Sequence, residues 1–185
     1  MDEIRPASDR FAGTKVEDTE RVEFKVAGEI AGIARFADGT VEERHYKNIM
    51  TEYSALLFAQ LAKGEQVPGI TRLAVGTGVG NGNLQNPEPA STTLTKLENE
   101  IARKAVVISY NTVEAAVNDG TRTNVLDLTV TFAENEAVGP ITEMALFGGV
   151  GAEAENGGTI VNAKRFPVWN KPDTATLTWT WRLVF

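Results

Sequence analysis

Hydrophobic and polar residues alternate along several stretches of this chain, which is the pattern of β-strands that bury one face. The alternation is clearest at the end of the sequence, where six apolar residues share one face: Ala175, Leu177, Trp179, Trp181, Leu183 and Phe185. Threonines and Arg182 occupy the other face. Because a tryptophan side chain buries on the order of 200 Å², two of them on one face predict a core strand. We expect the chain to end inside the fold, with nothing following Phe185.

Further strands are predicted wherever short apolar or alternating runs lie between turn residues. These runs cover residues 22–26, 41–46, 70–75, 105–110, 125–132, 141–148 and 159–169. Asp38-Gly39 predicts a hairpin turn because glycine adopts positive φ without penalty, and residues 118–121 supply a second turn. Gly28 and Gly32 interrupt the pattern after the first run, and Pro167 places the last run at a sheet edge.

One amphipathic helix is predicted between the early strands and the strand that begins at residue 70. Four of its residues fall at helical spacing: Met50, Tyr53, Leu57 and Leu61. Asn48 is expected to cap its first turn, because an asparagine side chain can accept from exposed amides. Lys63-Gly64 is expected to end it. A single helix of about 14 residues among strands is expected to cover an open end or edge of a sheet.

A second short helix is predicted over residues 91–103. Three apolar residues follow helical spacing there: Leu94, Leu97 and Ile101. Thr95 and Glu98 have the spacing of a capping box. Glu100 and Arg103 would pair within one turn, and an exposed pair of this kind contributes only a few tenths of a kcal/mol. The pair therefore matters only if it is buried or meets a partner chain.

A glycine-rich stretch, GTGVGNGN, follows the strand at residue 70 and covers residues 76–83. A phosphate-binding loop would lead into a helix, after Gly-Lys-Ser/Thr in a P-loop or directly behind the glycines of a dinucleotide site. The next residues are LQNPEP, residues 84–89, which do not favour a helix. We therefore interpret the stretch as a long surface loop.

The composition is that of a globular protein, with 42% hydrophobic and 23% charged residues among 185. We predict a mainly β protein, an antiparallel β-sandwich with one or two short helices, in which residues 22–185 form a single domain. Residues 1–21 contain few apolar side chains and are expected to form a flexible N-terminal arm. Two interpretations of the arm stay open: a disordered terminus, or a segment that orders against a neighbouring subunit.

The net charge of −7 argues against nucleic acid as a partner, because binding to phosphates needs clustered Lys and Arg. The absence of cysteine excludes disulfides and thiolate metal sites and fits a reducing cytoplasm. The first ten residues, MDEIRPASDR, lack the basic and then apolar pattern of a signal peptide. No run approaches the roughly 20 apolar residues that span a bilayer, so we expect no membrane insertion.

The sequence predicts no catalytic or metal-binding site. His45 is the single histidine, whereas a metal site needs several converging ligands. The acidic loops at residues 134–136 (ENE) and 153–156 (EAEN) lack the acid spacing of a calcium loop, and we interpret them as solvated loops. Neither a marked pair of glycosidase carboxylates nor a Gly-x-Ser-x-Gly elbow occurs. We therefore expect no enzyme activity, no cofactor and no metal.

Several short motifs follow one another in a characteristic order after the Asn48 helix start: Ile70-x-x-Leu-Ala-Val-Gly-Thr-Gly78, Pro89-x-x-x-Thr-Leu94, Leu97-x-x-Glu-x-x-Arg103 and Ile141-Thr-Glu143-Met-Ala-Leu-Phe147. With the closing strand over residues 177–185, this order resembles the attachment domains of tail fibres and of collar or baseplate connector proteins of tailed bacteriophages. The match covers roughly residues 35–185.

The resemblance implies a structural virion protein, made and assembled in the cytoplasm of the bacterial host. It implies a homo-oligomer, a trimer in such families, that docks onto other tail, neck or baseplate proteins. Such domains commonly continue into a long fibre or receptor-binding part. A chain that stops at Phe185 is therefore expected to be a small connector, collar or decoration component.

The alternative hypothesis is a carbohydrate-binding β-sandwich, in which an exposed Trp169 or Tyr110 would stack on a sugar ring. Trp179 and Trp181 do not suit this role, because their alternation places them in the core. A hydrolase is a third and residual alternative, since no set of catalytic residues supports it.

Overall fold

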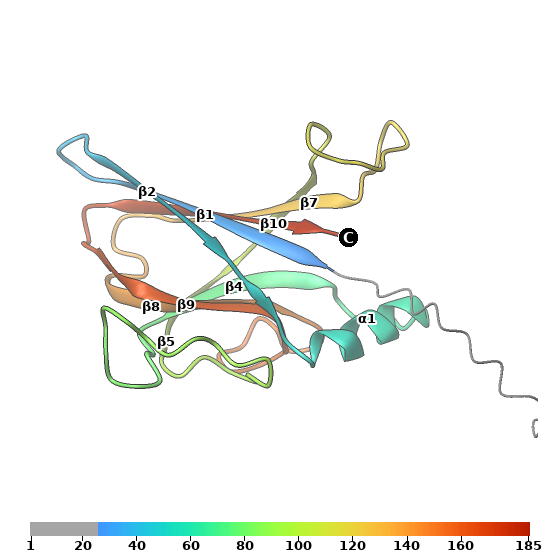
Figure 1. The fold of residues 1–185 in the computed structure, drawn as a ribbon, viewed down its shortest axis with the longest axis horizontal. Helices are drawn as coiled ribbons and strands as arrows, with labels where there is room; N and C mark the ends of the chain where they lie inside the picture. The colour runs from blue at the N-terminus through green and yellow to red at the C-terminus, as the bar shows by residue number, and fades with distance from the viewer. Residues whose placement is uncertain (1–25) are drawn as a thin grey trace, which may run out of the picture.

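The fold consists of two antiparallel sheets that face each other, seen in a computed structural model of the chain that describes residues 26–185 (Figure 1). Its elements in chain order are β1 (Ala27–Arg35), β2 (Val41–Lys47), β3 (Ile49–Met50), α1 (Ser54–Ala62), β4 (Ile70–Gly76), β5 (Glu100–Ala105), β6 (Val107–Tyr110), β7 (Val125–Phe132), β8 (Gly139–Gly148), β9 (Thr159–Lys171) and β10 (Thr176–Val184). The first sheet has the order β2-β1-β10-β7-β6, and the second has the order β3-β9-β8-β4-β5. The prediction of a mainly β, antiparallel sandwich is confirmed. The predicted arm and the start of the first predicted strand lie outside the described residues.

β10 lies in the middle of the first sheet, between β1 and β7. Its register on β7 runs from Leu177 opposite Phe132 to Val184 opposite Val125. Every second residue of β10 is buried, as the alternation predicts. Its two tryptophans point into the space between the sheets and are fully buried, which confirms their place in the core.

β1 continues through Gly28 and Gly32, so the prediction that these glycines interrupt the strand is wrong. Gly32 faces the aromatic core, where an added Cβ would lie 2.3 Å from Cζ3 of Trp179 and 2.6 Å from Cζ3 of Trp169. The two indoles meet edge to face, with ring centroids 5.2 Å apart. The strand needs glycine at position 32 because the rings fill the space of a side chain.

β8 is buried along residues 141–148, although it belongs to an antiparallel sheet. Its inner face joins the core that both sheets share. Its outer face is covered by the loops over residues 77–99 and 149–158, with Leu97 and Phe147 in a second apolar cluster (Figure 1). Burial on both faces explains why β8 is an almost continuous apolar run in the sequence.

At two of its crossings between the sheets, the chain changes from one sheet to the other within a single residue. Asn48 separates β2 from β3, and Val106 separates β5 from β6. The prediction of one strand over residues 105–110 is therefore wrong, because β5 ends in the second sheet and β6 begins in the first. A short apolar run carries no signal for such a change of neighbours, since both strands are extended.

α1 runs from Ser54 to Ala62 and is shorter than predicted. Met50, expected in the helix, instead lies in β3 opposite Asn162 of β9. No side chain caps the start of α1, so the prediction that Asn48 caps it is wrong. Strand pairing at residues 49–50 overrides the helical spacing of their side chains. The predicted glycine stop is confirmed, because Gly64 follows the helix with φ 80°.

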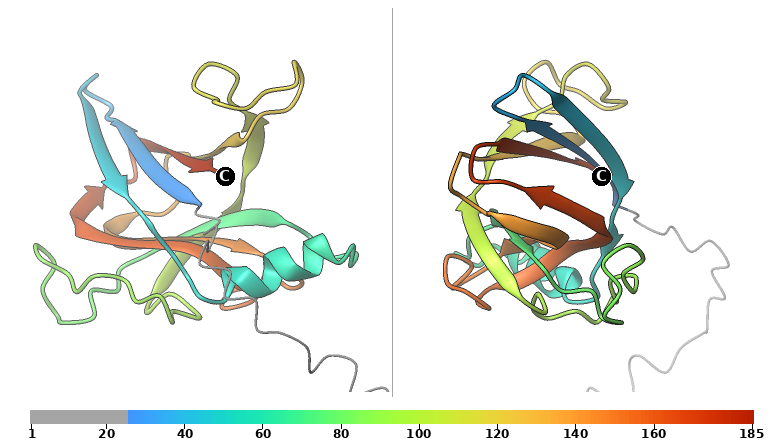
Figure 2. Two further views of the ribbon diagram at one scale, coloured as in Figure 1. Left: turned by 45° about the vertical axis from the view of Figure 1, so that its right-hand side comes forward. Right: turned by 90° about the vertical axis from the view of Figure 1, so that its left-hand side faces the viewer.

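α1 closes the end of the sandwich at which the chain terminates (Figures 1 and 2). Leu57 is the buried anchor of the helix, with no exposed surface. The ring of Phe58 meets the ring of Phe185 edge on, with centroids 6.3 Å apart. The expectation that a single helix covers an open end is confirmed.

The second predicted helix does not form: residues 91–99 are turns and irregular chain, and β5 begins at Glu100. The carboxylate of Glu98 accepts a hydrogen bond from the Gly80 amide at 2.8 Å instead of capping a helix. Leu97 is buried under the loop and Leu94 packs against the same cluster. Their spacing of three residues comes from a loop that folds over the sheet. Spacing alone does not distinguish such a loop from a helix.

The predicted turns and the edge proline agree with the structure. Gly39 and Gly120 have φ of 85° and 87° in the turns after β1 and before β7. β9 has β8 on one side and, on the other, only the two residues of β3, which pair with Asn162 and Ala163. Pro167 therefore lies where β9 has no strand on its second side, as predicted.

Candidate functional site

A shallow hollow of about 490 Å³ lies on the outer face of the first sheet, over β1, β2 and β10. Its polar lining consists of Glu29, His45, Thr180, Lys47 and Arg182. The hollow contains one carboxylate, whereas glycoside hydrolysis needs two. Nε2 of His45 lies 2.9 Å from Oε1 of Glu43 and so meets a surface carboxylate rather than a hydroxyl group. The lining therefore offers no assembled set of catalytic residues.

Within residues 26–185, no group of three or more His, Asp and Glu side chains gathers where it could hold a metal ion. In the loop over residues 134–136, Glu136 pairs with Lys104 at 2.6 Å and accepts from the Ala133 amide at 2.8 Å. The loop over residues 153–156 is exposed. Both acidic loops lie at the surface, as interpreted from the sequence.

The most elaborate polar site lies on the outer face of the second sheet and is centred on Glu143 of β8. Its side chain accepts hydrogen bonds from three main-chain amides, those of Gly78 at 3.0 Å, Asn99 at 2.9 Å and Glu98 at 3.2 Å. The guanidinium Nε of Arg165 lies 3.7 Å from the same carboxylate. We call these five residues the Glu143 clasp. Glu143 itself is 1% exposed, so the centre of the clasp is buried, whereas Glu98 and Asn99 at its rim are exposed.

The glycine-rich loop provides one side of the Glu143 clasp. The hydroxyl of Thr142 donates to the Gly78 carbonyl at 2.9 Å, next to the bond from the Gly78 amide to Glu143. A Cβ at Gly78 would lie 2.4 Å from Cβ of Glu98 and 2.5 Å from Oε1 of Glu143. Glycine is needed at position 78 because the loop backbone approaches the carboxylates so closely.

The loop after β4 is thus a surface loop and not a phosphate-binding loop, as interpreted from the sequence. No helix or strand forms over residues 77–99. The amides of Gly78 and Gly80 point at carboxylates of the chain itself, Glu143 and Glu98. These amides already have anionic partners, so they are not free to bind a phosphate.

A second buried ion pair, Glu100 with Arg103, borders the Glu143 clasp on β5. The two side chains form a bidentate contact of 2.7 and 2.6 Å, and they are 4% and 6% exposed. Arg103 also donates to the carbonyls of Ala152 and Gly157, at 2.7 and 3.0 Å. Its guanidinium lies 3.8 Å from the ring centroid of Phe147. The pair therefore fixes the loop over residues 149–158 to the sheet.

A β-bulge places Glu100 and Arg103 on one side of the strand. Residues three apart normally point to opposite faces of a strand. In β5, Ala102 pairs with Val75 and Glu100 with Gly76, so the residue between them is extra. The bulge places Glu100 and Arg103 close together at a spacing of three residues, which was interpreted from the sequence as one helical turn. The pair is therefore buried, which is the condition under which it was expected to matter, and it lies in a strand instead of a helix.

Several of the short motifs described in the sequence converge on this face of the second sheet. The glycines of the first motif and Glu143 of the last one meet in the Glu143 clasp. Arg103 stacks on Phe147, and Leu97 packs in the same cluster as Phe147. These residues hold two loops on a sheet. The sequence did not predict this role, although a single carboxylate inside the apolar run ITEMALFG is a signal for a buried anion with internal partners.

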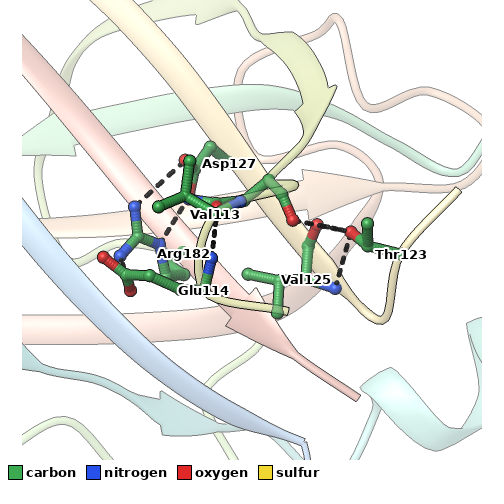
Figure 3. Close-up of polar contacts among 7 residues, drawn as sticks. Val113, Glu114, Thr123, Val125, Asp127 and Arg182 are labelled. Carbon is green, nitrogen blue, oxygen red and sulfur yellow. Dashed lines mark hydrogen bonds and ion pairs between the residues drawn. The ribbon is translucent and has the colours of Figure 1, made fainter. Parts of the chain in front are cut away.

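A third polar site fixes the loop over residues 111–124 to the outer face of the first sheet (Figure 3). Nε of Arg182 donates to Asp127 at 2.7 Å, and its other nitrogens contact Asp127 and Glu114. The side chain of Asn111 donates to Asp127 at 2.8 Å. We call these four residues the Asp127 cluster. The hydrogen bonds from Arg182 and then Asn111 hold the pKa of Asp127 below its ordinary value, although burial opposes them.

Trp169 is buried, with 2% of its surface exposed, so its predicted role as an exposed sugar-stacking ring is wrong. Its indole N–H donates to Glu42 at 2.9 Å, and the guanidinium of Arg44 covers the ring at 4.7 Å. Its place in β9, next to the shared core, removes the ring from solvent. Of the two rings considered for sugar stacking, Trp169 and Tyr110, only Tyr110 is exposed.

Exposed apolar side chains follow one another along β6 and the loop after it. The exposed fractions are 72% for Val107, 44% for Ile108, 47% for Tyr110, 90% for Val113 and 66% for Val117. The first three belong to the apolar run that was predicted as one strand, and among them only Tyr110 was considered as an exposed ring, in the carbohydrate-binding alternative. Clustered exposed apolar residues are a common feature of surfaces that bind other proteins.

Comparisons of the chain with protein-family models, with curated proteins and with solved structures found no match. Within the described part of the chain, no helix is long and apolar enough to cross a membrane. Function therefore has to be inferred from the residues of this chain and their arrangement.

Proposed function

We propose that this chain is a non-enzymatic structural protein of a tailed bacteriophage or of a phage-tail-like particle. In this proposal it forms a homo-oligomer and joins other tail, neck or baseplate proteins as a connector, collar, baseplate or fibre-attachment component. It is made and assembled in the bacterial cytoplasm and then resides in the particle. Its partners are proteins, and it binds neither nucleic acid nor a membrane.

The observation that supports the proposal most directly is that the buried charged residues bind the chain itself, whereas a run of apolar residues is exposed. The buried carboxylates and arginines of the second sheet bind main-chain groups of the chain itself, which is a structural use. The apolar side chains from Val107 to Val117 are turned to solvent, which is costly unless a partner covers them. A rigid sandwich with internal ion pairs and an exposed apolar edge suits assembly better than catalysis.

The phage assignment rests on the resemblance of the ordered motifs. In this chain, residues of these motifs form the Glu143 clasp and the packing beside it. The phage assignment does not depend on a receptor-binding surface or on a catalytic site. The carbohydrate-binding alternative loses Trp169 and would depend on Tyr110 alone, so we do not favour it.

The proposal is tested by composition analysis of particles from cells that make this protein. Particles are purified by sedimentation and ion exchange, and their proteins are quantified by mass spectrometry. We expect the chain at a fixed ratio to other tail proteins, with an abundant host enzyme absent from the same fraction as the control. Particles that assemble fully without the chain would show that the proposal is wrong, and cross-linking of intact particles would identify its neighbours.

A further inference from the structure

Among the described residues, β6 is the one edge strand longer than two residues that has no charged side chain. The strands at the edges of the two sheets are β2, β6, β3 and β5. β2 and β5 contain several charged residues, Glu42, Glu43, Arg44, Lys47, Glu100, Arg103 and Lys104, and β3 has only two residues. No charged residue occurs between Lys104 and Glu114, a stretch that contains all of β6. Charged and very short edge strands prevent pairing with other chains, and β6 lacks the charged protection.

The outward main-chain groups of β6 follow from its register on β7. Asn111, next to the end of β6, donates its amide to the carbonyl of Val125 at 2.9 Å. In an antiparallel ladder every second residue bonds to the same neighbour, so Ser109 and Val107 also turn their main-chain groups toward β7. Ile108 and Tyr110 therefore present their N–H and C=O groups to the open edge.

The side chains of Ile108 and Tyr110 lie on the core-facing side of the first sheet, opposite Leu128 and Leu126. Both remain nearly half exposed. The loop after β6 does not cover them, because the Asp127 cluster fixes it over the outer face of β7 and β10 (Figure 3). The edge of β6 is thus open in both its main-chain groups and its apolar side chains.

We propose that β6 pairs antiparallel with β6 of a second copy of this chain, so that the two first sheets form one continuous sheet. The two-fold axis passes between the two Ser109 residues. Ile108 of each copy then lies opposite Tyr110 of the other copy, which gives about four main-chain hydrogen bonds. Each exposed Ile108 covers an exposed Tyr110, so the strand is complementary to itself.

Charge favours the same contact. Each copy has a net charge of −7, so two copies repel each other on average. The uncharged stretch from Ala105 to Val113 is where they approach with the least repulsion. A pair of four-residue strands buries less than the roughly 1,000 Å² of a stable interface. The dimer is therefore weak in solution and is strengthened in a particle, where other contacts hold the copies together.

Cysteine cross-linking tests the pairing and its register. This inference rests on the homo-oligomer of the proposed function. The chain has no cysteine of its own, so each variant contains a single cysteine per copy. In the Ser109→Cys variant the two sulfurs face each other across the axis, where Cα atoms about 4.5 Å apart permit a disulfide. In the Val107→Cys variant the same pairing places the two Cα atoms about 14 Å apart.

We expect mild oxidation to give mostly linked dimer for Ser109→Cys and little for Val107→Cys at equal concentration. Equal linking of the two variants, or no linking of either, would overturn the pairing. The Ile108→Lys variant adds a charge to the open edge and should weaken self-association at least tenfold. Val41→Lys, at the edge strand β2, is the matched control and should leave self-association unchanged.

The outcomes separate this inference from the proposed function. A stable trimer that is unaffected by Ile108→Lys would overturn the β6 pairing and leave the proposed particle protein in place. A chain that is absent from particles but cross-links through Ser109→Cys would support the pairing and contradict the proposed function. Near-native circular dichroism of each variant confirms that it has folded.

Discussion

The buried carboxylate of Glu143 accepts a hydrogen bond from the Gly78 amide at 3.0 Å, which fixes the glycine-rich loop to the middle of the second sheet. A carboxylate without partners in such a place would be strongly unfavourable, and here three amides and Arg165 surround it. The loop over residues 77–99 therefore has a defined shape without any helix or strand of its own.

The Glu143→Gln substitution tests this role of the carboxylate. The variant keeps the side-chain shape but loses the negative charge and turns an N–H₂ group toward main-chain amides. We expect a loss of about 2–4 kcal/mol in the free energy of unfolding, measured by denaturant titration. Limited proteolysis should first cut residues 77–99. Glu153→Gln, in an exposed loop, is the control, and an equal effect of the two substitutions would contradict the account.

The two Arg pairs with spacing i,i+3 offer a matched comparison of buried and exposed ion pairs. Arg103 and Glu100 are 6% and 4% exposed, whereas Arg122 and Asp119 are 72% and 46% exposed. A lysine cannot reproduce the fork of Arg103, which binds Glu100 and two carbonyls at once. We expect Arg103→Lys to cost about 2–3 kcal/mol and Arg122→Lys to have a much smaller effect on stability. Similar Tm values for the two variants would refute the structural role of the buried pair.

The Gly32→Ala substitution tests the packing of the aromatic core. The new methyl group would meet Trp179 and Trp169 at less than 3 Å, so the indoles must move. We expect a loss on the order of 3 kcal/mol and a change in tryptophan fluorescence. Gly69→Ala is the control, because a Cβ there meets nothing within 4 Å and the φ of Gly69 is not positive. An unchanged Tm for Gly32→Ala would show that the core is looser than described.

The Asp127 cluster predicts a pH dependence. The pKa of Asp127 is lowered in the folded protein, so its stabilisation is present above the unfolded pKa of about 4 and is lost as the pH falls through the folded value. Asp127→Asn should lower Tm by about 2–4 °C at pH 7. The difference in Tm between the original protein and the variant should shrink below pH 4 or so. A difference that stays constant down to about pH 2 would contradict this prediction.

Deletion of Met1 to Glu20 tests the hypothesis that the N-terminal arm contributes to assembly. The deleted residues include few apolar side chains, so Tm should change little. We expect self-association or incorporation into particles to weaken, because the truncated chain lacks the arm that would contact a neighbouring subunit. Assembly of the truncated chain at the original concentration would leave the alternative, a terminus without a role in assembly.

The strands could be predicted where one face of a strand is buried and the other is wet. β10 and β7 follow their alternation almost residue by residue. The turn at Asp38-Gly39 was also predictable, since its conformation depends on local chemistry. These features need no knowledge of what lies across the sheet.

The errors lie where distant contacts decide the local structure. Met50 has helical spacing, yet β9 pairs with it as a strand. Leu97 and Arg103 also read as helical, yet a covering loop and a bulge produce their spacing. The carbohydrate-binding alternative assumed an exposed Trp169, but its side chain is buried and the guanidinium of Arg44 covers the ring. None of these partners is near in sequence.

The candidate site was the least predictable part. Glu143 and Arg165 come from different strands, and their meeting depends on the register of β8 and β9. The open edge of β6 was not predicted, because the apolar run from Ala105 to Tyr110 was interpreted as one strand. Only the crossing at Val106 leaves its second half exposed.

The central claim is that this chain is an assembly protein whose copies associate. Light scattering of the purified full-length chain over a dilution series measures this directly. The account predicts a mass above that of one chain at high concentration, approaching two chains and falling on dilution. The mass of a single chain at every concentration would contradict it.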